Sequence, residues 1–231
     1  MKKLLIASTS TVHGKSYLAY ILPELKVFFK GVDTILFIPF ARPSGLTHDE
    51  YTEKVRSVFA TINIKVEGLH SFKNPIVALK NSKGIFTGGG NTFLLVKQLH
   101  DNNLMTVLST ALKSGIPYLG CSAGSNICGI SMQTTNDMPI VYPRSFETLA
   151  IIPFNLNPHY LDPDSNSSHK GETRETRIKE FHVFNETPVI GLREGSWLEV
   201  IGKSITLKGN LKARFFEQNR RPVELNSGYK F

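Results

Sequence analysis

Short hydrophobic runs mark the first half of the chain, and each run ends at turn-forming residues. They cover residues 4–7 before Ser8-Thr9-Ser10, residues 35–38 before Pro39, residues 84–86 before Gly88-Gly89-Gly90, and residues 117–120 before Cys121-Ser122. Apolar runs without polar alternation are typical of strands buried on both faces of a parallel sheet.

Helical patterns fill the intervals between these runs, at about residues 16–29, 48–61, 92–100 and 104–114. In the second interval Tyr51, Val55, Val58 and Phe59 recur at helical spacing, which predicts one buried face. Strands that alternate with helices predict an α/β fold with a mostly parallel sheet flanked by helices.

The second half of the chain has a different pattern. Residues 136–164 are rich in Pro, Asn and aromatic residues, which predicts long loops and one strand. Residues 171–185 read as a charged amphipathic helix and residues 187–192 as a strand. From residue 197 onward, short alternating segments predict an antiparallel meander at the edge of the sheet. Because the pattern contains neither repeat nor linker, we expect residues 1–231 to form a single domain.

Composition narrows the class of protein. Of 231 residues, 41% are hydrophobic and 20% charged, which excludes a mainly disordered, collagen-like or coiled-coil chain. Lys and Arg outnumber Asp and Glu by 27 to 19, giving a net charge of +8. Such an excess favours an anionic partner, either nucleic acid or a small acidic substrate.

The two cysteines, Cys121 and Cys128, cannot form a disulfide framework, and their spacing is not that of a zinc site. We therefore expect a reduced, cytoplasmic protein without a metal or a cofactor. No apolar run approaches the roughly 20 residues of a membrane helix, and the N-terminal run lacks a signal-peptide cleavage pattern, so no membrane association is expected.

The strongest local motif is Gly120-Cys121-Ser122-Ala123-Gly124, which fits G-x-S-x-G directly after a predicted strand. This context is typical of a nucleophile elbow, in which the serine hydroxyl stands exposed on a sharp strand-to-helix turn. The N–H group of Ala123 would then point at a developing oxyanion. The alternative is a plain glycine-rich turn.

A second glycine cluster, Gly88-Gly89-Gly90-Asn91-Thr92, also follows a strand and precedes a helix. Its N–H groups could supply the other half of an oxyanion hole. A phosphate-binding loop or a capped turn is the alternative. A Walker A motif is excluded because no Gly-Lys-Ser/Thr follows.

A serine nucleophile needs a base and an orienting acid. Among seven histidines, His159 is the best candidate, since it follows Pro158 in a loop after an apolar segment. Glu194 comes directly after the strand at residues 187–192, although it could instead pair with Arg193. The order Ser122, His159, Glu194 differs from that of α/β-hydrolases, in which the acid precedes the histidine.

Taken together, the motifs resemble the peptidase E family of aspartyl dipeptidases. The matching segments are Gly88-Gly89-Gly90-Asn91-Thr92-Phe93, Gly120-Cys121-Ser122-Ala123-Gly124, Thr134-Thr135-Asn136-Asp137-Met138-Pro139-Ile140-Val141, Asn157-Pro158-His159, His169-Lys170-Gly171-Glu172-Thr173-Arg174 and Glu194-Gly195-x-Trp197. The resemblance implies a flavodoxin-like, class I glutamine-amidotransferase-like fold. One departure is Cys121, where an aromatic or small residue is expected.

The resemblance also implies the roles of the site residues. Ser122 would be the nucleophile, His159 the base and Glu194 the acid, with oxyanion donors at the N–H groups of Gly90 and Ala123. The implied reaction is hydrolysis of dipeptides with an N-terminal aspartate, by a monomer or homodimer.

For the aspartyl carboxylate, Arg174 is the first choice because arginine offers a bidentate fork, with His169 and Lys170 nearby. For the free amine, Asp137 or Glu172 is expected. Alternatively, Glu172 and Arg174 belong only to a helix N-terminus and its solvated face.

Three other functions stay open. They are cyanophycinase-like cleavage of β-linked aspartyl peptides on a related fold, a non-catalytic small-ligand module, and nucleic-acid binding. The last is disfavoured because the basic segments at residues 80–83 and 208–221 carry no recognised binding motif.

Overall fold

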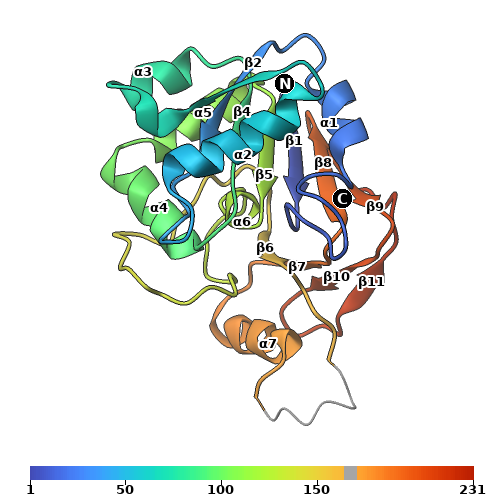
Figure 1. The fold of residues 1–231 in the computed structure, drawn as a ribbon. Coiled ribbons are helices and arrows are strands. Elements are labelled where there is room, and N and C mark those ends of the chain that lie inside the picture. The colour runs from blue at the N-terminus through green and yellow to red at the C-terminus, as the bar shows by residue number, and fades with distance from the viewer. Residues whose placement is uncertain (164–170) are drawn as a thin grey trace.

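The chain forms two β-sheets in the computed structural model, which describes residues 1–163 and 171–231 (Figure 1). The large sheet has the order β3-β2-β4-β5-β1-β8-β9. Its strands are β1 (Lys3–Ala7), β2 (Thr34–Ile38), β3 (Lys65–Gly68), β4 (Ile85–Thr87), β5 (Tyr118–Cys121), β8 (Ser196–Ile201) and β9 (Ser204–Gly209). The small sheet has the order β11-β10-β7-β6, formed by β6 (Asn155–Pro158), β7 (Val189–Leu192), β10 (Ala213–Phe216) and β11 (Val223–Leu225).

The large sheet is parallel from β3 to β1 and antiparallel at its β8–β9 edge. The predicted mostly parallel sheet with an antiparallel C-terminal edge is thus confirmed. After their first residue β1 and β2 are buried throughout, as are β4 and β5, which agrees with the uninterrupted apolar runs that predicted them.

Helices cover both faces of the large sheet. They are α1 (Leu22–Phe28), α2 (His48–Ala60), α3 (Pro75–Lys80), α4 (Thr92–Asp101), α5 (Met105–Ser114) and α6 (Ala123–Asn126). A 3-10 turn, η1 (Leu69–Ser71), lies next to β2 and α3, and α7 (Arg174–Phe184) lies beside the small sheet (Figure 1). On one face, α1 and α2 pack through residues such as Leu25 and Phe59 against Phe37. On the other face, α3, α4 and α5 join a core that also includes Leu156 and Ile190 of the small sheet. One hydrophobic cluster therefore connects the two sheets.

Two elements differ in length from the prediction. The first helix begins at Leu22 rather than near residue 16, because Leu18 has a φ of 57° and the chain turns before Pro23 enters the first helical turn. The helix predicted at residues 171–185 begins at Arg174, where the hydroxyl of the N-cap Thr173 accepts from the N–H of Thr176.

The expected antiparallel meander at the sheet edge is confirmed for its first two strands and wrong for the later ones. Only β8 and β9 extend the large sheet, whereas β10 pairs with β7 and with β11 in the small one. The predicted strand before Glu194 is β7, and it belongs to the small sheet. Alternation is a local property, and it does not tell which sheet a strand joins.

Across residues 1–163 and 171–231, no helix has both the length and the apolarity to cross a membrane.

Candidate active site

Ser122 stands between β5 and α6 with an unusual backbone conformation, φ 53° and ψ −110°. Its flanking glycines permit this turn by close approach. A Cβ atom on Gly120 would lie 2.4 Å from Gly124 O, and one on Gly124 would lie 2.2 Å from Thr87 O. A non-glycine residue held in such a conformation is the strained geometry that a nucleophile elbow requires.

His159 connects the other two predicted residues. Its Nε2 atom lies 2.9 Å from Ser122 Oγ, and its Nδ1 atom lies 2.6 Å from Glu194 Oε1. Both distances allow hydrogen bonds, and with the proton on Nδ1 the ring presents an acceptor to the serine. The His159 and Glu194 side chains are 38% and 41% exposed, so a small substrate can reach the site.

A tight turn places Glu194. The N–H of Ser196 donates to Arg193 O at 3.1 Å, and Gly195 within the turn has a φ of 91°. Arg193 does not pair with Glu194. Its guanidinium binds Asp162 and Glu224 instead, at 2.6–2.9 Å, and this leaves Glu194 to His159.

The glycine loop after β4 lies directly against Ser122, since a Cβ atom on Gly89 would come within 3.0 Å of Ser122 Cβ. Three N–H groups of the loop have partners: that of Gly88 donates to Ile38 O, that of Gly89 to the Tyr51 hydroxyl, and that of Asn91 to Ala41 O.

Within the described residues, the N–H groups of Gly90 and Ala123 have no hydrogen-bond partner in the protein. The two N–H groups expected to bind an oxyanion are therefore available. Gly90 also has a φ of 146°, and a Cβ atom there would lie 2.2 Å from Ala41 O, so only glycine fits.

Asp137 lies at the start of α4, next to this loop. Its Oδ2 atom accepts from the Thr92 N–H at 2.7 Å and from the Thr135 hydroxyl at 3.0 Å. Its Oδ1 atom has no hydrogen-bond partner among the residues that the structure describes. Asp137 thus stabilises the helix N-terminus and keeps one oxygen for a ligand.

Arg174 occupies the first position of α7, where its side chain is half-buried. Burial lowers the pKa of its guanidinium and the nearby Arg177 adds to this effect, while the negative charge of Asp137 opposes it. Arg174 and Asp137 therefore lie within electrostatic range of each other.

The structure gives less support to the other residues predicted to bind substrate. Glu172 is exposed just before Thr173, and no side-chain contact in the described ranges brings it to the other site residues. His169 and Lys170 lie outside the described residues, as does most of the loop after Asp162.

Sequence reasoning missed a group of polar residues behind the site. The Asn136 amide donates to Pro158 O at 2.7 Å, and the Asn157 amide donates to Asn136 Oδ1 at 2.8 Å. The Asn126 amide donates to the hydroxyls of Thr92 (3.0 Å) and Thr135 (3.2 Å). These bonds link the elbow helix, the oxyanion loop and the strand before His159. The run of polar residues at 134–137 was the available signal.

Cys121 and Cys128 are buried free thiols, and burial raises the pKa of each well above its ordinary value. Neither is therefore a reactive thiolate. The described residues contain no group of three or more His, Cys, Asp or Glu side chains that could hold a metal ion.

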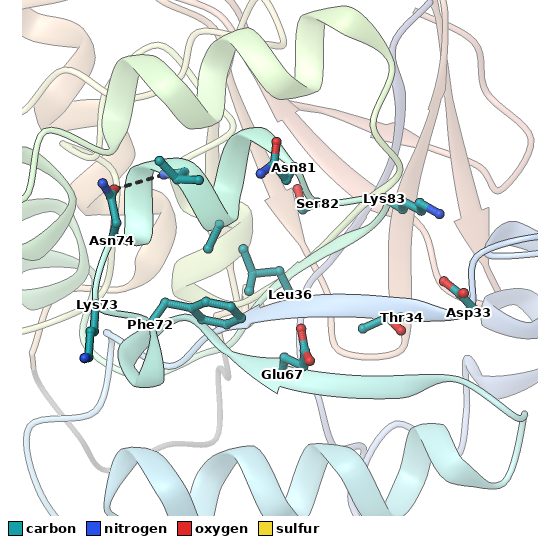
Figure 2. A pocket seen from close by; sticks show the side chains of 12 residues that line it. Asp33, Thr34, Leu36, Glu67, Phe72, Lys73, Asn74, Asn81, Ser82 and Lys83 are labelled. Atoms are coloured by element: carbon teal, nitrogen blue, oxygen red, sulfur yellow. Dashed lines mark hydrogen bonds between the residues drawn. The ribbon is translucent and has the colours of Figure 1, made fainter.

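A pocket of about 620 Å³ lies elsewhere, beside β2 and α3 (Figure 2). Lys73 and Phe72 lie at one end of it, and Asp33 and Lys83 at the other. Since Ser122, His159 and Glu194 do not line this pocket, it is separate from the site described above.

Fold and site together define an α/β protein with a serine–histidine–carboxylate arrangement at a nucleophile elbow. The sequence model of peptidase family S51 matches residues 4–208. Peptidase E of Streptomyces coelicolor is 46% identical over 97% of this chain and 91% of its own length. A protein named "probable alpha-aspartyl dipeptidase" from Drosophila melanogaster is 44% identical over 97% and 93%. The chain belongs to peptidase family S51.

Solved structures agree on the fold. The crystal structure of a protein named "putative peptidase E protein" from Listeria monocytogenes EGD-e superposes with a TM-score of 0.69 at 21% identity, over 90% of this chain and 98% of that one. A peptidase from an acI-B1 Actinobacterium gives a TM-score of 0.74 at 17% identity, over 100% and 96%. The α/β fold that the resemblance to peptidase E implies is confirmed.

Proposed function

We propose that this protein is a serine dipeptidase that hydrolyses Asp-Xaa dipeptides through an acyl-enzyme on Ser122. The observation that carries the proposal is a chain of two hydrogen bonds. His159 Nδ1 lies 2.6 Å from Glu194 Oε1, and His159 Nε2 lies 2.9 Å from Ser122 Oγ. Family membership and the names of the relatives agree with it.

The first half of the reaction forms the acyl-enzyme. Ser122 Oγ attacks the peptide carbonyl carbon while His159 Nε2 accepts the hydroxyl proton. Glu194 holds the proton-bearing Nδ1 and stabilises the imidazolium that forms. The N–H groups of Gly90 and Ala123 bind the oxyanion, and each such donor is worth about 10²–10³ in rate.

His159 then returns the proton to the leaving amine, and the peptide C–N bond breaks, which completes the acyl-enzyme. In the second half, water enters, loses a proton to His159 and attacks the acyl carbon. As that intermediate collapses, the bond to Ser122 Oγ breaks, His159 returns the proton to Oγ, and aspartate is released.

For the substrate, we propose Arg174 as the reader of the aspartyl carboxylate and Asp137 as the reader of the free amine. Arg174 is a partly desolvated cation, which strengthens its interaction with an anion. Asp137 Oδ1 is the oxygen left for an ammonium group. Glu172 is the second candidate for binding the amine, although no contact among the described residues joins it to the other site residues.

A dipeptide panel tests the proposal. The wild type should cleave Asp-Leu in preference to Asn-Leu and Glu-Leu, and Ser122→Ala should be folded and inactive. Cleavage of an isoaspartyl dipeptide in preference to Asp-Leu would support the cyanophycinase-like alternative. Activity that survives in Ser122→Ala would refute the mechanism.

The same panel tests Arg174. Arg174→Ala should lower the preference for Asp-Leu over Asn-Leu by about 10- to 100-fold, the value of a hydrogen bond to a charged group. Arg177→Ala, three residues along the same helix, is the matched control. An equal loss on all three dipeptides would show that Arg174 does not read the carboxylate.

We also propose that the chain acts as one domain in a reducing, cytoplasmic environment. The hydrophobic cluster shared by both sheets supports the first point, and the two unpaired cysteines support the second. Measuring the molecular mass in solution distinguishes the two expected states, a monomer and a homodimer.

A further inference from the structure

The end of β1 contacts all three segments that carry the proposed catalytic residues. β1 lies between β5, which leads to Ser122, and β8, which begins just after Glu194. Its last residue, Ala7, and the following residue, Ser8, are both completely buried, at 0% exposure. Neither residue has a role in the mechanism above.

The Ser8 hydroxyl connects the base to the strand that leads to the acid. It donates to Leu192 O at 2.6 Å and accepts from the His159 N–H at 2.9 Å. Leu192 O also accepts from the N–H of Tyr160, at 3.2 Å. The backbone N–H groups of His159 and of the next residue, Tyr160, are therefore both hydrogen-bonded. Leu192 lies only two residues before Glu194.

The backbone of the same two residues holds the rest of the site. The Ser8 N–H donates to Ser196 O at 3.0 Å, and Ser196 closes the turn that carries Glu194. Ala7 O accepts from the Ser122 N–H at 3.2 Å and from the Ser125 hydroxyl at 2.6 Å. The segments that carry Ser122, His159 and Glu194 are therefore all hydrogen-bonded to Ala7 or Ser8.

His159 needs such support because its φ is 55°, a conformation that costs energy for any residue except glycine. Without the Ser8 oxygen, the His159 N–H and Leu192 O would lose a partner in a buried place. The loop would relax, and the imidazole would move relative to Ser122. A displacement of about 1 Å at a reacting group can lower the rate by about 10²-fold.

We infer that Ser8 is a positioning residue that holds His159 and Glu194 in line with Ser122. This inference rests on the proposed function. Ser8 acts through the backbone of its neighbours, since its hydroxyl is occupied by His159 N and Leu192 O, and it takes no part in proton transfer.

Three variants test Ser8. In Ser8→Ala, kcat for Asp-Leu should fall about 10- to 100-fold while KM stays within about twofold, because alignment is lost and substrate binding is not. Ser8→Thr keeps the hydroxyl and should retain most of the activity. Thr52→Val is the matched control: Thr52 is also buried and its hydroxyl donates to His48 O at 2.7 Å, but it lies on α2. Thr52→Val should lower the melting temperature and leave kcat unchanged.

The inference is overturned if Ser8→Ala keeps the wild-type kcat, or if its activity falls only as far as its folded fraction does. Should Ser8→Ala not fold, Ser8→Cys replaces it, with a group of similar size and weaker hydrogen bonds. Its kcat should then lie between those of the wild type and the inactive Ser122→Ala.

The labelling rate of Ser122 by a fluorophosphonate separates this inference from the proposed function. That rate depends on His159 and needs no dipeptide specificity. A wild type that is labelled but cleaves no dipeptide refutes the proposed substrate, while slower labelling of Ser8→Ala still supports the role of Ser8. A wild type that is neither active nor labelled refutes both.

Discussion

His159 Nδ1 lies 2.6 Å from Glu194 Oε1, although the two residues are 35 positions apart and follow different strands of the small sheet. The carboxylate accepts the Nδ1 proton, and the ring therefore turns a free Nε2 lone pair toward Ser122. In Glu194→Gln, the amide N–H can face Nδ1 and favour the opposite tautomer. We expect kcat to fall by about 10³-fold or more with KM little changed, as measured by steady-state kinetics. A kcat within tenfold of the wild type would contradict this assignment.

The Gly90 position should be intolerant of any side chain. In Gly90→Ala, the new Cβ atom would meet Ala41 O, and the N–H group would move from the oxyanion. We expect kcat to fall by about 10²–10³-fold. Gly31→Ala is the control, because Gly31 also has a positive φ (84°) but nothing lies within 4 Å of its Cβ position. Equal kinetic losses in both variants would point to backbone strain rather than to oxyanion binding.

Asp137 should contribute to substrate binding through its charge. Asp137→Asn retains an oxygen that can accept from the Thr92 N–H, so the free energy of unfolding should change by less than about 1 kcal/mol. The substrate ammonium loses its counter-charge, and we expect KM for Asp-Leu to rise about tenfold or more. Kinetics combined with urea unfolding checks both parts. An unchanged KM would leave Asp137 as a helix cap only.

Acid should weaken the ion pairs that Glu224 makes with Arg193 and Arg214. Hydrogen bonds from Arg193, and then from Arg214, lower the pKa of Glu224 below its ordinary 4.5. A lowered pKa in the folded state means that ionised Glu224 stabilises the fold above about pH 4.5, and that this contribution disappears as the pH falls through the lowered pKa.

Glu224→Gln should therefore be less stable than the wild type near neutral pH, by about 1 kcal/mol at most for so exposed a group. The difference should shrink below about pH 4.5, as measured by urea unfolding at several pH values. Glu217→Gln is the control, since among the described residues Glu217 makes an ion pair only with the exposed Arg220. A difference that is constant with pH would exclude the electrostatic origin.

The parallel strands and long helices could be predicted because their sequence periods are clear. β3 was missed because only Val66 and Gly68 of its four residues are buried, as befits an edge strand. α3 was missed because it has only six residues, and its start depends on Asn74 capping the N–H of Val77. The division into two sheets depends on pairings between distant segments, such as β7 with β10, which no local pattern contains.

For the site, each member of the serine–histidine–carboxylate row had a local signal: the elbow motif, the Pro-preceded loop and the end of a strand. Ser8 and Asn136 had none of comparable strength. Ser8 meets His159 across 151 positions and Leu192 across 184, and these contacts exist only in the folded chain. Support for a site is thus harder to predict than the reacting groups themselves.

The division of the site between two sheets has a consequence for the newly made protein. The elbow with Ser122 is synthesised early, whereas the strands that carry His159 and Glu194 complete their sheet only by pairing with β10, at Ala213–Phe216. A chain that ends before Ala213 lacks the strand that pairs with the outer side of β7, although β6 and β7 can still pair with each other. We therefore expect such a truncated chain to hold Glu194 less firmly than the full-length chain does.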